Sequence, residues 1–116
     1  MVSSPDPRQN YLLASLPEVQ WKRWEPDLEA VDLPLGHVLY EAGSTMKYVY
    51  FPTTAIVSLL YVMGSGASAE IAVVGNDGLV GISLFMGGES TPNRAVVQSA
   101  GQGYRLASQA IKEEFR

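Results

Sequence analysis

The chain has 116 residues, a length that suits one domain able to bury roughly two-thirds of its unfolded surface around a single core. Apolar residues make up 47% of it and charged residues 17%, a balance that excludes extensive disorder. The formal net charge is −4 and no basic stripe runs through the sequence, so we do not expect this chain to bind DNA, which requires clustered cations opposite the phosphates.

The cysteine and histidine content limits the metal and redox chemistry. The sequence contains no cysteine, which excludes disulfides, iron–sulfur clusters and thiolate zinc sites. His37 is the single histidine, which excludes a multi-histidine metal site of the cupin type. We therefore expect neither a metal nor another cofactor.

The sequence shows no targeting signal. Its first ten residues lack the order of a basic and then an apolar segment that marks a signal peptide. The longest apolar stretch, around residues 55–63, is much shorter than the ~20 residues that span a bilayer. The expected location is the cytoplasm, with no membrane association.

The predicted elements begin with short helices over about residues 10–28. Asn10 can cap a turn that contains Leu12 and Leu13. Trp21 and Trp24 are three residues apart and share one helix face, so we expect them to pack this segment onto the domain rather than to stack on a ligand. Pro26 is expected to end the helix just before it.

From residue 29 onward, the sequence is typical of short β-strands separated by turns rich in glycine and proline. Many short strands at this spacing indicate a sandwich or a barrel. The run at 56–63 is apolar on both faces, so we expect it to lie between two layers. A break in the strands is expected at 101–103, where two glycines occur. The predicted strands cover 30–33, 37–40, 48–51, 56–63, 70–74, 79–85, 94–99 and 103–106.

The last ten residues, ASQAIKEEFR, again predict a helix. Ser108 is a plausible cap, and Ile111 and Phe115 are four residues apart, so they share a helix face. An apolar face at this end must be covered. We expect the helix either to fold back on the strands and keep a monomer, or to meet a second copy in a weak homodimer.

The order of these elements resembles the effector-sensing domain of Crp–Fnr-type bacterial transcription regulators. The resemblance extends from about residue 12 to residue 115. It implies a mainly β fold, an antiparallel β jelly roll (double-stranded β-helix) of the cyclic-nucleotide-binding type with short flanking α-helices. The segments YVYFPTTAIVSL, GLVGISLFMGG and PNRAVVQSAGQGYRL resemble a strand pair, the nucleotide-cradling segment and the strands after it. The residues that match the family pattern G-x-V-[LIV]-[FY]-x-x-G are Gly36, Val38, Leu39, Tyr40 and Gly43.

On this resemblance, residues 1–116 form a single sensor domain. It has leading helices at about 10–28, the jelly roll at 29–106 and the start of a C-terminal helix at 107–116. In the family, an effector in the jelly roll biases a long dimerising helix, which repositions a helix-turn-helix. The sequence contains no DNA-binding domain, which fits either a truncated regulator or an orphan sensing domain.

The resemblance implies that Arg94 pairs with the phosphate of a nucleotide. A guanidinium suits this task because it presents a planar fork of donors to an anion. Strand alternation places Arg94, Val96 and Gln98 on one face. The alternative interpretation is an arginine at a strand end that faces solvent or belongs to a structural ion pair.

The nucleotide cradle departs from the family at two positions. Cyclic-nucleotide binders carry a glutamate for the ribose hydroxyl, and here that position holds Ile82 in one register and Gly81 in the other. The serine or threonine expected after the arginine is replaced by Ala95. Losing two hydrogen bonds that involve charged groups weakens binding by roughly 10²–10⁴-fold. We therefore expect cyclic AMP to bind weakly or not at all.

Other polar groups near the cradle offer partial replacements. Ser83, Ser90 and Thr91 supply hydroxyls, backbone amides at 87–88 could contact an anion, and Glu89 could replace the missing acid. Ordinary loop polarity explains each of them as well. The candidate ligand-binding residues are Gly81, Ile82, Ser83, Arg94, Ala95 and Val96.

Catalysis finds no support in the sequence. No serine lies in a G-x-S-x-G motif, and His37 has no recognisable catalytic partner. The expected function is therefore the sensing of a small anionic or nucleotide effector, and not an enzymatic activity. The alternative is an orphan jelly roll that acts by protein–protein contact without a small ligand.

Overall fold

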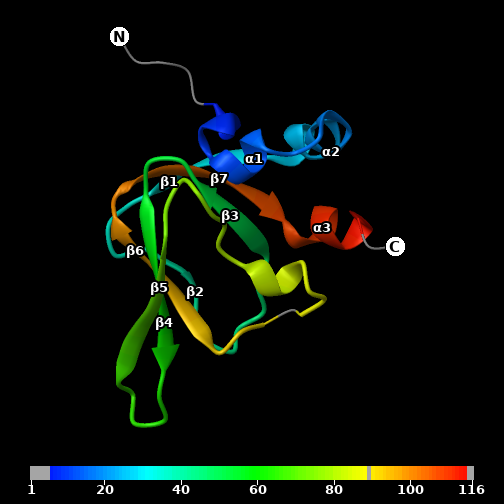
Figure 1. Ribbon diagram of the computed structural model, residues 1–116. Coiled ribbons are helices and arrows are strands. Elements are labelled where there is room, and N and C mark those ends of the chain that lie inside the picture. The colour runs from blue at the N-terminus through cyan, green and yellow to red at the C-terminus, as the bar shows by residue number, and fades with distance from the viewer. Residues whose placement is uncertain (1–5, 89, 115–116) are drawn as a thin grey trace.

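The computed structural model describes residues 6–88 and 90–114, and in these residues seven strands form two sheets (Figure 1). Every strand pair in the two sheets is antiparallel. The predicted antiparallel β jelly roll is therefore confirmed. One sheet has the order β1 (Glu29–Leu33), β7 (Gly101–Ala107), β3 (Tyr48–Pro52), and the other β2 (Val38–Tyr40), β6 (Asn93–Ser99), β4 (Ile56–Val62), β5 (Ser68–Val74).

The helices gather on one side of the three-stranded sheet, as Figure 1 shows for α1, α2 and α3. The α-helices are α1 (Tyr11–Ala14), α2 (Glu18–Trp24) and α3 (Ser108–Glu114). Short 3₁₀-helices lie at η1 (Pro7–Gln9), η2 (Glu25–Asp27) and η3 (Ile82–Leu84). The helix predicted before Pro26 ends at Trp24, and Asn10 caps α1 by accepting hydrogen bonds from the backbone N–H of Leu12 and of Leu13.

Strand β3 separates two apolar cores because its side chains alternate between the faces of its sheet. Val49 and Phe51 face the helices and pack in one cluster with the tryptophans of α2. Tyr50 faces the opposite way, into a second cluster between the two sheets. The inter-sheet cluster is completed by Leu33, Ala55, Val57, Val80, Ala95 and Val97.

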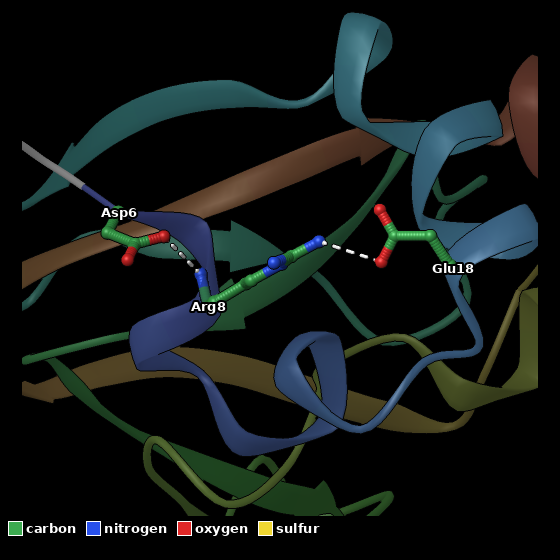
Figure 2. Close-up of polar contacts among 3 residues, drawn as sticks. All are labelled: Asp6, Arg8 and Glu18. Atoms are coloured by element: carbon green, nitrogen blue, oxygen red, sulfur yellow. Dashed lines mark hydrogen bonds and ion pairs between the residues drawn. The ribbon is translucent and has the colours of Figure 1, made fainter.

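The N-terminal segment is joined to α2 through Arg8. Figure 2 shows its backbone N–H donating to Oδ1 of Asp6 at 2.9 Å, while Nη2 lies 3.5 Å from Oε2 of Glu18. The same guanidinium lies 4.3 Å from the ring centroid of Trp21. These contacts hold the first turn against the helix that carries the buried tryptophans.

The strand predicted at 79–85 is wrong. Val80 makes an isolated bridge with Tyr50, through backbone hydrogen bonds of 2.9 and 2.8 Å, and extended structure ends there. Gly81 has a φ of 108°, a conformation that glycine adopts without the clash of a Cβ atom. This residue turns the chain into η3, which buries Leu84 in the helical core.

The expectation that the run 56–63 lies between two layers is also wrong. In this run, Val57 is buried between the sheets, but Ile56, Tyr61 and Met63 are exposed. Ser58 is buried on the outer face, where its hydroxyl lies 2.6 Å from Glu70 and 3.0 Å from Gln98. Apolar residues of β4 and β5 that include Ile56, Ile71 and Val73 remain exposed.

The break between β6 and β7 is shorter than predicted: β6 ends at Ser99 and β7 begins at Gly101, so Gly101–Gly103 lies within β7 and not in a turn. A Cβ atom on Gly103 would lie 2.9 Å from the carbonyl oxygen of Phe51 and 3.0 Å from Cα of Pro52. Glycine therefore allows β7 to approach β3 closely here, and it marks tight strand packing and not a turn. Each of the other predicted strands matches one observed strand to within two residues at either end.

Helix α3 folds back on the three-stranded sheet. Ile111 is fully buried in the helical core with Leu13, Trp24 and Leu106. Phe115, predicted to share its face, lies outside the described residues. Of the two outcomes expected for this end of the chain, the burial of Ile111 corresponds to the first.

Candidate functional site

Arg94 lies on the outer face of the four-stranded sheet, near the start of β6. Ala95 and Val97 are fully buried between the sheets, so Arg94, Val96 and Gln98 project from the opposite face. Ala95 pairs with Tyr40 on one side and Leu59 on the other. The predicted phosphate-binding arginine therefore lies on a hydrogen-bonded strand, next to a buried alanine that has no hydroxyl.

Glu41 is the ion-pair partner of Arg94. The Nε atom of Arg94 lies 2.9 Å from Oε1 of Glu41, and the two side chains are 38% and 57% exposed. The N–H direction does not meet the geometry of a hydrogen bond, and this buried Nε has no hydrogen-bond partner among the described atoms. A buried donor left unsatisfied costs about 1–3 kcal/mol, so the guanidinium has unused capacity for an acceptor.

Two loops meet beside this pair, and we call their junction the Arg94 seam (Glu41, Gly43, Ser44, Thr91 and Arg94). The backbone N–H of Gly43 donates to the carbonyl of Thr91 at 2.8 Å. The Ser44 hydroxyl donates to the carbonyl of Glu41 at 2.7 Å. These bonds fix the backbone of the seam and do not involve the Glu41 carboxylate.

Three other predicted site residues lie elsewhere, beside β3 and η3. Gly81 lies against the backbone of Tyr48 and Val49, and the Ser83 hydroxyl is 3.8 Å from Sδ of Met46. Ile82 is 58% exposed. Among the described residues, no hydrogen bond or ion pair joins Gly81, Ile82 or Ser83 to Arg94, Ala95 or Val96.

Of the further polar candidates, Thr91 belongs to the seam. Its hydroxyl accepts a hydrogen bond from the backbone N–H of Asn93 at 3.3 Å. The N–H of Gly88 is already engaged with the carbonyl of Ser83 at 2.8 Å, which leaves it unavailable to an anion. Glu89 lies outside the described residues. No group of three or more metal-ligating side chains occurs in the described part of the chain.

A second arginine, Arg105, lies in a polar cluster that local sequence pattern does not predict. Its Nε donates a 3.3 Å hydrogen bond to Oε1 of Glu29, and its guanidinium lies 4.0 Å from the ring centroid of Tyr48. Burial raises the pKa of Tyr50, while a hydrogen bond with Arg105 opposes this effect. The strand register places Glu29, Arg105 and Tyr50 side by side, and that register could not be read from local pattern.

Two cavities lie near these residues. One has a volume of about 190 Å³ and is lined by residues that include Tyr40, Tyr48 and Tyr50. Burial raises the pKa of the Tyr40 phenol. The other is an apolar groove of about 280 Å³ under α1, lined by residues that include Leu12, Phe51, Leu79, Ile82 and Phe85. Arg94 lines neither cavity.

The two antiparallel sheets and their flanking helices define the class of this protein as a jelly-roll domain. Residues 30–116 match the family described as the cyclic nucleotide-binding domain. The chain therefore belongs to the cyclic nucleotide-binding domain family, and it resembles the sensor domains of Crp/Fnr-type regulators. No curated protein matches the sequence.

Solved structures share the fold. The sensor domain of the transcriptional regulator DNR from Pseudomonas aeruginosa is 16% identical, with a TM-score of 0.75 over 93% of this chain and 73% of that one. The N-terminal domain of a transcriptional regulator from Streptomyces coelicolor A3(2) is 26% identical, with a TM-score of 0.71 over 92% and 75%. The regulatory domain of Toxoplasma gondii PKA, solved with cAMP, is 17% identical, with a TM-score of 0.77 over 92% and 41%.

The helices of the described residues are short. None of them is long and apolar enough to cross a membrane.

Proposed function

We propose that this chain is the effector-sensing domain of a Crp/Fnr-type transcription regulator and that its effector is an anion bound at Arg94. The observation that carries the proposal is the buried Nε of Arg94, which has no hydrogen-bond partner among the described atoms. Buried donors are almost always satisfied in folded proteins, so an unsatisfied Nε, on the arginine that resembles the family's phosphate-binding residue, favours a missing acceptor.

We infer further that cyclic AMP is not this effector. Ala95 is buried without a hydroxyl, and Ile82 is exposed at a position where a carboxylate would be needed. Glu41, the carboxylate that reaches Arg94, would repel a phosphate there and cannot serve the ribose at the same time. Isothermal titration calorimetry of the chain with cyclic AMP should show no binding at micromolar concentrations, and a micromolar dissociation constant would contradict this inference.

A thermal-shift screen of anionic metabolites and nucleotides tests the sensing role itself. A ligand that binds only the folded state raises the apparent stability, by about 2.7 kcal/mol at a hundred times its dissociation constant. The true effector should raise the melting temperature of the natural chain and leave that of an Arg94→Gln variant unchanged. A stabilising ligand that acts equally on both would place the site away from Arg94.

A second candidate function is protein contact without a small ligand. It is favoured by apolar residues that are exposed on the outer face of the β4–β5 hairpin, which include Ile56, Ile71 and Val73. In that case, no metabolite would stabilise the chain, and an Ile71→Asp, Val73→Asp double variant would lose its partner while keeping its fold.

The proposal extends to the setting of the domain. We infer that the domain is bacterial, cytoplasmic and non-enzymatic. We also infer that it does not itself bind DNA, because its net charge is −4. A gel shift at low salt with tight retardation would contradict this. We also infer that a homodimer, in keeping with the family, is at most weak, because Ile111, which could have met a second copy, is buried in the core of its own chain. Sedimentation over a concentration series measures it, and a monomer at every concentration would rule it out.

A further inference from the structure

The two arginine–glutamate pairs of the jelly roll differ in how well each guanidinium is satisfied. Arg105 donates a hydrogen bond to Glu29 and stacks on the Tyr48 ring. Arg94 lies closer to its carboxylate, at 2.9 Å against 3.3 Å, yet its buried Nε–H makes no hydrogen bond. Arg105 is thus held as a structural group, whereas Arg94 has proximity to an anion without the directed contact.

We propose that Glu41 is an internal competitor, which occupies the anion position at Arg94 until a dianionic phosphate group displaces it. This inference rests on the proposed function, since it assigns the chemistry and the regulation of the same site. Carboxylate and phosphate oxygens bind a guanidinium in the same way, so the two anions compete for one place.

Displacing Glu41 costs little in the geometry observed. Its side chain is 57% exposed, so the carboxylate can swing into water without losing a buried environment. The backbone of the Arg94 seam need not move, because the Gly43–Thr91 and Ser44–Glu41 bonds involve backbone carbonyls and not the carboxylate. The Glu41 carboxylate can therefore leave Arg94 without a change in the backbone of the seam.

The charge of the incoming anion decides whether it displaces the Glu41 carboxylate from Arg94. Glu41 is tethered, so it competes at an effective concentration of about millimolar or more. A phosphodiester carries one negative charge, the same as the carboxylate, and gains no electrostatic advantage over it. A phosphate monoester carries about −1.5 to −2 at pH 7 and has three acceptor oxygens, so it can also satisfy the free Nε–H. The site therefore favours a monoester or inorganic phosphate over any diester.

The test follows the arginine Nε–H signals of the ¹⁵N-labelled chain by NMR during titration with inorganic phosphate and with dimethyl phosphate. Phosphate should shift the Arg94 signal and leave that of Arg105 in place, and dimethyl phosphate should have little effect. In a Glu41→Gln variant, phosphate should bind about fivefold more tightly, which corresponds to the upper range of about 1 kcal/mol for an exposed ion pair. A Glu29→Gln variant is the matched control and should bind as the natural chain does.

Equal phosphate affinity in the natural chain and in Glu41→Gln would overturn the competitor role. Binding of dimethyl phosphate as tight as that of phosphate would overturn the preference for a dianion. Both outcomes differ from failure of the proposed function, which would appear as the absence of any stabilising metabolite in the thermal-shift screen. An effector found in that screen together with an unchanged Glu41→Gln affinity would remove only the present inference.

Discussion

The side-chain amide of Asn10 donates a hydrogen bond of 2.8 Å to the carbonyl of Pro52, at the end of β3. Its second hydrogen reaches the carbonyl of Gly78 at the same distance, and its oxygen accepts from the first turn of α1. Asn10 is fully buried. One amide therefore joins the leading helix, the three-stranded sheet and the turn that precedes Val80.

An Asn10→Ala substitution should lower the free energy of unfolding by about 2–4 kcal/mol. The helix loses its cap, which is worth about 1 kcal/mol, and two carbonyls lose a donor in a buried or partly buried environment. Urea denaturation followed by circular dichroism measures the change. Asn76→Ala is the control because Asn76 is exposed, and it should change stability by less than about 0.5 kcal/mol. Equal losses of unfolding free energy in the two variants would show that the buried hydrogen bonds of Asn10 do not stabilise the fold.

Local sequence pattern is sufficient to predict features that depend on residues close together in the chain. These features include the helix cap at Asn10 and the strand alternation that places Arg94 and buried Ala95 on opposite faces. The pattern does not predict the contacts of the same Asn10 with Pro52 and Gly78, which lie 42 and 68 residues away. Such contacts depend on tertiary register, and a period of two residues contains no information about it.

The wrong interpretations have the same origin. A strand was expected through 79–85 because its residues are apolar, but the left-handed conformation of Gly81 ended it after Val80. A break was expected at Gly101–Gly103, whereas the lack of a Cβ at Gly103 serves close packing against Phe51. A glycine does not reveal from sequence alone whether it permits a turn or a close approach. For the candidate site, the resemblance to the family points to Arg94, but no sequence pattern predicts its pairing with Glu41.

Replacing Ile111 with alanine should lower the free energy of unfolding by about 2–5 kcal/mol, the usual cost of removing a large side chain from a packed core. The side chain is fully buried with Leu13 and Trp24, so α3 should loosen as the cavity forms. Gln109→Ala, at an exposed position of the same helix, is the control and should be nearly neutral. If the two variants were equally stable, the docking of α3 on the sheet would be refuted.

Alkaline pH should destabilise the fold through its buried phenols. Burial raises the pKa of Tyr40 above its ordinary value of 10.0, because the anion is poorly solvated there. The folded state then retains its proton at a pH where the unfolded state releases it. The stabilising contribution is present below about pH 10 and is lost as the pH rises through the higher folded value.

A Tyr40→Phe variant should therefore lose less stability than the natural chain between about pH 9 and about pH 11, as urea midpoints will show. The loss will not vanish, because burial also raises the pKa values of Tyr50 and Tyr104. Tyr61→Phe, at an exposed position, should follow the natural chain. Identical pH profiles for Tyr40→Phe and the natural chain would contradict the prediction.

Substitutions of the two arginines of the jelly roll should differ in their effect on the free energy of unfolding. Arg105→Gln loses a hydrogen-bonded ion pair with Glu29 and the stacking on Tyr48, so it should lower the free energy of unfolding by about 1–2 kcal/mol. Arg94→Gln loses a pair that is partly exposed and not hydrogen-bonded, and it also removes an unsatisfied buried donor, so the change should stay within about 0.5 kcal/mol. Urea unfolding of both variants, without added anions, measures the difference. An arginine that binds an effector should contribute little to the stability of the fold when no effector is present. If Arg94→Gln destabilised the chain as much as Arg105→Gln does, Arg94 would be a structural residue.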